Sequence, residues 1–321
     1  MNRREEAVPG PNSAKDKTMA TEAAKAKPEA TPQAVPADPA YLKIRDLIYR
    51  VSGIYQPEEK LYLLVSRCAR RMSAVGANTP SEYLEHLTTL GNREAELRLL
   101  LNEITIGETY MFRSSPQLEA LRTVVLPQVM ETKRAMGFKR LRFWSAGCST
   151  GEEPYTLAMF LLEESEKLLA GWSFDILATD LNDNALQAAM AGVYGDYALR
   201  HTTEVLRRKY FKVHDEKRLE VTDQLKSHVR FDRVNLSDDS RMLFLKGMDV
   251  IFCCNVLIYF DLASKRRVVQ HFYSNLLSNG YLFLGPAESL FQVNDTFRLV
   301  HFPGTTGYWK APANSPAGGK P

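Results

Sequence analysis

The feature that most constrains the fold is the stretch at 141–154, which reads LRFWSAGCSTGEEP. Four of its first six residues, Leu141, Phe143, Trp144 and Ala146, are apolar at the spacing of a short buried strand. Five small residues follow at 147–151 and predict a tight turn. Two acids and a proline at 152–154 then favour a helix start. A strand, a glycine turn and a helix N-terminus form a typical binding site for a nucleotide cofactor. Glycine lets the backbone approach the ligand closely, and the helix start offers free N–H donors.

The turn matches neither of the common phosphate-binding motifs. Ala146 and Cys148 break the G-x-G-x-x-G spacing, and no G-K-[ST] follows. Glu152 and Glu153 argue against bound phosphate, which a helix start would otherwise attract. The two acids suit a ligand with cationic groups and sugar hydroxyls, and S-adenosylmethionine is one such ligand. The alternative is a tight turn whose acids are merely solvated.

Two further strand patterns end in polar residues. SFDILATD ends in Asp180, and MDVIFCC is followed by Asn255. A helical crossover from the first strand implies a parallel sheet, so Asp180 lies beside the glycine turn and can accept both hydroxyls of an adenosine ribose. The alternative for Asp180 is a helix N-cap. Asn255 needs a partner, which can be a ligand, and Tyr259 lies near the same crevice; the alternative is a turn asparagine and a packing tyrosine.

The order of the predicted elements indicates the fold class. About seven strands, the last two an antiparallel pair, predict an α/β, doubly wound, mostly parallel seven-stranded sheet of the S-adenosylmethionine-dependent methyltransferase type. Helical periodicity precedes it, and the tails have too few apolar residues to fold. We therefore expect a disordered tail at 1–38, a small N-terminal helical domain at 39–104, a linker and helix at 105–136, a methyltransferase domain at 137–312 with a small antiparallel β subdomain inserted at 192–228, and a second disordered tail at 313–321.

Two basic features, a set of four cations on one predicted helix and the single residue Arg113, each have two explanations. Lys60, Arg67, Arg70 and Arg71 lie on one side of a predicted helix. They form either an ordinary solvated face or a dock for an acidic partner. Arg113 ends the segment TIGETYMFR and makes either an interdomain salt bridge or a fixed guanidinium aimed at a carboxylate.

The whole-chain composition excludes several classes of function. The net charge of +3 gives little support to nucleic-acid binding. The four cysteines lack zinc or disulfide spacing, so we expect no metal site and a reducing compartment. No apolar run approaches 18 residues and no signal peptide is evident, so we expect a cytoplasmic protein without membrane insertion.

Six motifs together resemble the CheR family, the chemotaxis receptor glutamate methyltransferases. They occur in the family's order and spacing over roughly residues 40 to 310. The motifs are ETYMFR (108–113), WSAGCSTGEEPY (144–155), LATDL (177–181), RVNL (233–236), NVLIYF (255–260) and LGPAESL (284–290).

The resemblance implies a protein-glutamate O-methyltransferase. Its methyl donor is S-adenosylmethionine, its product is S-adenosylhomocysteine, and its partner is the cytoplasmic domain of a methyl-accepting chemotaxis receptor. Arg113 and Tyr259 are implied to lie near the transferred methyl. The implied cofactor contacts are Thr109, Arg113, Glu153, Asp180, Asn235, Leu236, Asn255 and Val256.

The resemblance also implies how the receptor is recognised. The basic face at 60–71 matches the family's receptor-docking helix. The inserted unit lacks a glycine-rich loop, so we expect recognition that does not need a receptor C-terminal pentapeptide. Gly107 departs from the family, which often has asparagine there. Two rival functions are a methyltransferase for another substrate and a non-catalytic signalling adaptor.

Overall fold

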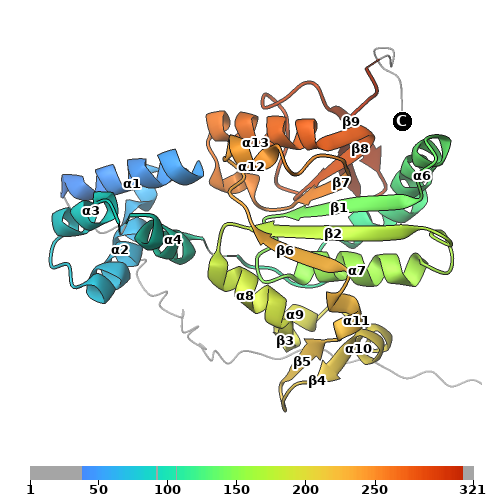
Figure 1. Ribbon diagram of the computed structural model, residues 1–321, viewed down its shortest axis with the longest axis horizontal. Coiled ribbons are helices and arrows are strands. Elements are labelled where there is room, and N and C mark those ends of the chain that lie inside the picture. Colours follow the sequence, from blue (N-terminus) through green and yellow to red (C-terminus); the bar gives the residue numbers. More distant parts are fainter. Residues whose placement is uncertain (1–37, 92, 106, 314–321) are drawn as a thin grey trace, which may run out of the picture. The chain divides into compact units, whose positions relative to one another are not determined.

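The computed structural model describes residues 38–91, 93–105 and 107–313 (Figure 1). The two predicted tails lie outside this part of the chain, apart from residues 38 and 313. Within it, no helix is both long and apolar enough to cross a membrane.

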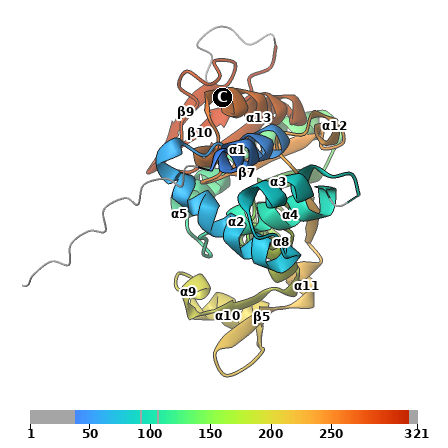
Figure 2. The ribbon, with the colours of Figure 1, turned by 90° about the vertical axis from the view of Figure 1, so that its left-hand side faces the viewer.

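Four helices form the first part of the described chain, as predicted, and Figure 2 shows them as one group. The first begins where the Asp38 carboxylate accepts the N–H of Ala40 at 2.9 Å, and it ends at Gly53. Its predicted apolar face is buried, including Ile44 and Ile48. The helices are α1 (Pro39–Ser52), α2 (Leu61–Val75), α3 (Pro80–Thr88) and α4 (Arg93–Ile104), with a 3-10 turn, η1 (Glu58–Lys60), before α2.

The main sheet has seven strands in the order β6-β2-β1-β7-β8-β10-β9. The first five are parallel and the last two join antiparallel, which confirms the predicted fold class. Because β2 and β7 flank β1 on opposite sides, the chain reverses direction across the sheet there, and ligands bind at such a switch point. The strands are β1 (Arg140–Ala146), β2 (Ser173–Asp180), β6 (Val229–Arg233), β7 (Met248–Cys253), β8 (Leu276–Leu284), β9 (Arg298–Phe302) and β10 (Thr305–Trp309).

Helices cover both faces of this sheet, so its central strands are apolar on both sides. Trp144 and Ile251 belong to one core cluster with α13 and the N-terminal helices, while Phe143 and Phe252 belong to a second with α5 to α7. The covering elements are α5 (Ser115–Ala120), η2 (Leu121–Val125), α6 (Leu126–Ala135), α7 (Glu152–Glu164), α8 (Asp183–Ala191), α12 (Asp239–Met242), η3 (Leu257–Tyr259) and α13 (Leu262–Asn275).

The helix predicted over 116–136 is present but contains a π-helical turn, η2, that helical periodicity does not predict. Pro127 follows this turn and has no N–H to donate, so the regular bonding ladder cannot continue through it.

The inserted unit is a three-stranded antiparallel sheet in the order β3-β5-β4. Two of its strands are predicted, whereas β3 is not, because a strand of three residues that follows Gly192 and ends in Gly195 is too short to give a periodic signal. Tyr210, predicted to begin a strand, instead ends a helix. The elements are β3 (Val193–Gly195), α9 (Asp196–Leu199), α10 (Glu204–Tyr210), β4 (Phe211–Val213), β5 (Arg218–Val221) and α11 (Asp223–Lys226).

Candidate active site

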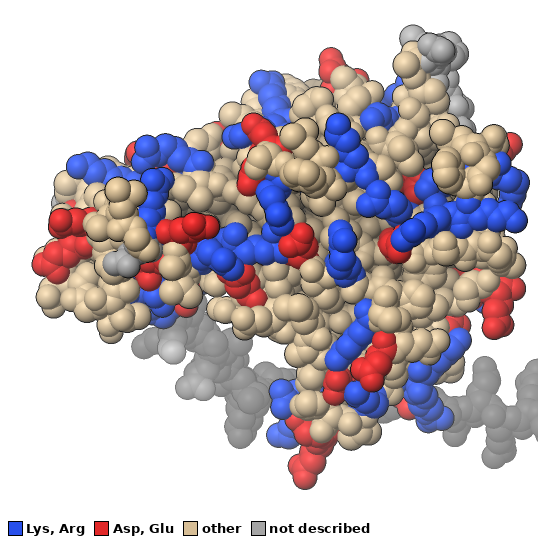
Figure 3. Space-filling model, viewed as in Figure 1, with Lys and Arg blue, Asp and Glu red and all other residues tan. Residues whose placement is uncertain are grey.

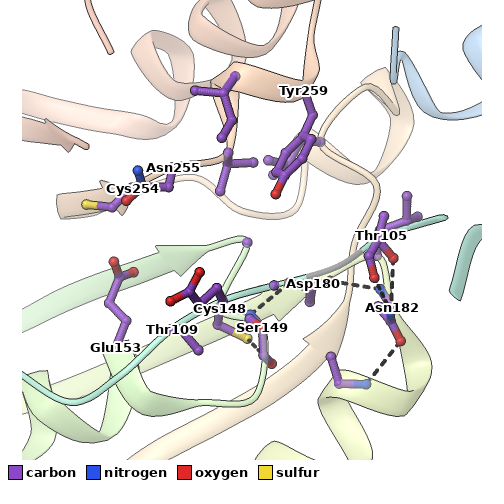
Figure 4. A pocket seen from close by; sticks show the side chains of 18 of the residues that line it. Thr105, Thr109, Cys148, Ser149, Glu153, Asp180, Asn182, Cys254, Asn255 and Tyr259 are labelled. Carbon is purple, nitrogen blue, oxygen red and sulfur yellow. Dashed lines mark hydrogen bonds between the residues drawn. The ribbon is translucent and has the colours of Figure 1, made fainter. Parts of the chain in front are cut away.

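A cavity of about 650 Å³ lies at the carboxyl ends of β1, β2 and β7 (Figure 4). The linker segment after α4 and the chain between α1 and α2 complete its walls. Its volume falls in the range of about 300–1,000 Å³ that small-molecule sites occupy. All of the residues predicted for the site line it: Thr109, Arg113, Glu153, Asp180, Asn235, Leu236, Asn255, Val256 and Tyr259.

The glycine turn after β1 is fixed by the neighbouring strand β2. The N–H groups of Gly147 and Cys148 both donate to the Thr179 carbonyl, at 2.8 and 2.9 Å. A Cβ at position 147 would lie 2.4 Å from a methyl carbon of Val256, and φ is +79° there. Only glycine therefore allows the turn and the loop after β7 to approach this closely.

Two backbone N–H groups fix the carboxylate of Asp180 at the cavity wall. One oxygen accepts the N–H of Ser149 and the other that of Asn182, both at 2.8 Å. Burial raises the pKa of Asp180, and these backbone donors oppose that rise. Each oxygen keeps further acceptor capacity, which two ribose hydroxyls can use. The alternative role is wrong, because the N-cap of α8 is Asn182.

Of the two adjacent acids, Glu153 lines the cavity, whereas Glu152 does not and instead accepts a hydrogen bond from the Thr150 hydroxyl. Glu153 accepts the Ser145 hydroxyl at 2.6 Å. Burial raises the pKa of Glu153 to about 7, while hydrogen bonds from Ser145 and Cys254 lower it. A carboxylate this poorly compensated favours a cationic ligand, which would restore its ionised form.

The loop after β7 is anchored by Glu288, which belongs to the motif LGPAESL but is not among the predicted site residues. Its carboxylate accepts the N–H groups of Asn255 and Gly285, both at 2.7 Å, and of Ile258 at 3.2 Å. Asn255 has φ of +62°, an uncommon conformation that these bonds support. Glu288 therefore positions Asn255 and, through the same loop, Tyr259.

Asn235 serves the fold as well as the cavity. Its amide nitrogen donates to the Val51 carbonyl at 2.6 Å, and its oxygen accepts the N–H of Ser237 at 3.0 Å. Asn235 thus ties the end of α1 to the edge of the sheet. Leu236 beside it is a buried apolar residue of the cavity wall.

The segment carrying Thr109 and Arg113 forms the opposite wall. The Phe112 N–H donates to the Thr156 hydroxyl at 3.1 Å, and φ of +58° at Phe112 turns the chain sharply. Arg113 is exposed and donates to the Glu108 carbonyl at 2.8 Å. Within the described residues Arg113 makes no ion pair, so the predicted alternative of an interdomain salt bridge is not observed.

Gly107 lies against the glycine turn. A Cβ at this position would be 2.1 Å from the Ser149 hydroxyl oxygen and 2.8 Å from the Ser149 Cβ. An asparagine here would require Ser149 to move, so the departure from the family pattern has a steric reason.

The four predicted docking cations divide into two pairs. Lys60 and Arg67 line the cavity. Arg70 pairs with Glu103 at 2.6 Å, and Arg71 makes two hydrogen bonds to Glu96, a buried residue. Elsewhere, Figure 3 shows basic and acidic side chains interspersed over the face it presents.

A doubly wound seven-stranded sheet with an acid-lined cavity at the ends of β1, β2 and β7 defines an S-adenosylmethionine-dependent methyltransferase. Residues 39–105 match the CheR methyltransferase all-alpha domain, and residues 107–305 match the CheR methyltransferase SAM-binding domain. The chain therefore belongs to the CheR methyltransferase family, and its cofactor is S-adenosylmethionine.

Several relatives named chemotaxis protein methyltransferase match over most of their length. Chemotaxis protein methyltransferase 2 of Vibrio cholerae is 34% identical over 85% of this chain and 93% of its own. The chemotaxis protein methyltransferase of Borreliella burgdorferi is 34% identical over 76% and 86%, and methyltransferase 1 of Pseudomonas aeruginosa is 34% identical over 80% and 92%. Among solved structures, N-methyltransferase NodS from Bradyrhizobium japonicum is 15% identical over 57% of this chain and 77% of its own, with a TM-score of 0.31. The family assignment therefore rests on the two matching family models and on the sequence relatives.

Proposed function

We propose that this protein transfers a methyl group from S-adenosylmethionine to glutamate side chains on the cytoplasmic helices of chemotaxis receptors. The observation that carries the proposal is the convergence of nine sequence-predicted residues on one cavity. The relatives' name, chemotaxis protein methyltransferase, supports the receptor as the substrate.

Different residues of the cavity bind different parts of the cofactor. Glu153 supplies negative charge for its cationic end, and Asp180 supplies acceptors for the ribose hydroxyls. Leu236 and Val256 contribute apolar surface. Thr109, Arg113, Asn235 and Asn255 make the remaining contacts.

The reaction needs orientation more than proton transfer. The bound cofactor supplies a methyl group that its sulfonium already activates. An acceptor glutamate is ionised at neutral pH, so no general base is required. The protein's contribution is to align the acceptor and to exclude water. Arg113, exposed at the cavity and free of an ion pair among the described residues, orients the acceptor carboxylate, and Tyr259 shapes the space beside it.

Receptor docking follows from the two cations at the cavity. Lys60 and Arg67 are the docking residues in this proposal, whereas Arg70 and Arg71 mainly stabilise the helical domain at 39–104 through their acidic partners. The turn between β4 and β5 is short, with the His214 N–H donating to the Arg218 carbonyl at 3.0 Å. That short turn supports recognition without a receptor pentapeptide.

The test is transfer of a tritiated methyl group to a panel of receptor cytoplasmic fragments. We expect label on glutamate that mild base releases, because methyl esters hydrolyse readily. Base-stable label, or label only on another acceptor, would favour a methyltransferase of different specificity. Calorimetry with S-adenosylhomocysteine distinguishes the enzyme from a non-catalytic adaptor. If this protein does not bind S-adenosylhomocysteine, it is not the proposed enzyme.

A further inference from the structure

The segment at 108–113 is held from its outer side by the inserted β subdomain. The Met111 N–H donates to the Ala198 carbonyl at 2.9 Å. The Tyr197 hydroxyl donates to the Glu108 carboxylate. These contacts place the residues of α9 against the back of a cavity wall.

Arg200, just after α9, makes the most specific of these contacts. Its guanidinium carbon lies 3.3 Å from the ring centroid of Tyr110 and 3.9 Å from that of Tyr197. One of its nitrogens donates to the Tyr197 carbonyl at 2.5 Å, which fixes the side chain from its own subdomain. A planar guanidinium suits a site between two rings, whereas a lysine ammonium cannot stack in this way.

Tyr110 connects this contact to the cavity. It lines the cavity, and the Arg113 guanidinium lies 5.6 Å from its ring centroid on the same segment. The Glu108 backbone accepts from Arg113 while its carboxylate accepts from Tyr197. A continuous set of contacts therefore runs from Arg200 to the residue that orients the acceptor.

We propose that Arg200 is a positioning residue for methyl transfer: held between Tyr110 and Tyr197, it keeps residues 108–113 in the shape that presents Thr109 and Arg113 to the cavity. The roles of Thr109 and Arg113 rest on the proposed function. The inserted subdomain thus supports the active site without touching the reactants.

The kinetic test compares Arg200→Ala and Arg200→Lys with Arg208→Ala in the full chain. Arg208 is a matched control, because it is an exposed cation of the same subdomain that pairs only with Glu204 among the described residues. At saturating cofactor we expect both Arg200 variants to lower kcat about tenfold, because a loosened wall misplaces Arg113. The KM for the receptor fragment stays within twofold, and Arg208→Ala behaves as the wild type.

A double-mutant cycle asks whether Arg200 acts through Arg113. In an Arg113→Lys background, Arg200→Ala should lower kcat by less than about twofold, because residues that act as a unit are not additive. A full additional tenfold loss would overturn the proposal. A second pattern would also overturn it: Arg200→Lys keeps wild-type kinetics, and Arg200→Ala raises only the KM for the receptor fragment. That pattern would mean that the charge at position 200 recognises the acceptor directly.

Hydrogen exchange supplies a readout independent of activity. The Met111 amide should exchange faster in Arg200→Ala and Arg200→Lys than in the wild type and in Arg208→Ala. Unchanged exchange in both Arg200 variants would overturn the proposal even if methylation fell. If the wild type labels no receptor fragment, the proposed function fails, and the exchange result still decides whether Arg200 holds this segment.

Discussion

The two walls of the cavity are built in different ways. On the sheet side, Asp180 and Glu288 bind backbone N–H groups at the ends of strands. On the linker side, the exposed Arg113 donates to the Glu108 carbonyl, and the exposed Arg200 contacts the ring and the carbonyl of Tyr197. The first arrangement is preorganised for a small ligand. The linker-side arrangement can adjust. Such adjustment suits this wall, because a large protein acceptor must pass it to reach the cavity.

This difference predicts that linker-side variants change turnover and sheet-side variants change cofactor affinity. Arg113→Ala should give the largest effect, a loss of kcat of about 100-fold, because alignment of the acceptor is the main catalytic contribution. The affinity for S-adenosylhomocysteine should fall less than kcat, and the melting temperature should not change. Methylation of a receptor fragment and calorimetry measure the two quantities.

Near-wild-type turnover in Arg113→Ala would remove this residue from the mechanism. A loss of affinity as large as the loss of turnover would erase the contrast between the walls, because Arg113 would then act mainly on the cofactor.

Asp180→Ala should weaken S-adenosylhomocysteine binding by about 10- to 100-fold, since hydrogen bonds to a charged group are worth about 1.5–3 kcal/mol. Asp175→Asn is the control, because Asp175 lies on the same strand and pairs with exposed Arg140 away from the cavity. Equal affinities in the two variants would contradict the ribose role of Asp180.

The affinity for S-adenosylhomocysteine should also depend on pH through Glu153. Burial raises the pKa of Glu153 to about 7 in the free protein, and the cationic end of the ligand favours the ionised form. Affinity is therefore full above pH 7 and falls as the pH drops through this value, by about tenfold for each unit well below it. Calorimetry from pH 5.5 to 8 measures the slope, and Glu153→Gln should bind weakly with no such slope. A wild-type profile as flat as that of the variant would show that Glu153 does not face the ligand's charge.

The contrast between the walls also explains what the sequence could predict. Apolar periodicity locates the strands, so Asp180 and Asn255 at strand ends follow from local pattern and sheet topology. The sequence did not assign Glu288 to the site, because its anchoring role depends on a contact with a loop 33 residues away. The pairing of Arg71 with Glu96 is likewise a tertiary contact, which helical periodicity alone does not reveal. Arg200 was not singled out for the same reason.

The smallest predicted effect concerns the place where the two walls meet. Gly107→Ala should weaken S-adenosylhomocysteine binding about two- to fivefold, because the new Cβ displaces the Ser149 side chain and disturbs the turn beside Asp180. Adding Ser149→Gly should restore the affinity to within about twofold, since Ser149 has φ of +49° and glycine adopts that conformation readily. Ser149→Gly alone is the matched control. A double variant as weak as Gly107→Ala would mean that backbone freedom at 107, and not the space taken by Ser149, requires the glycine.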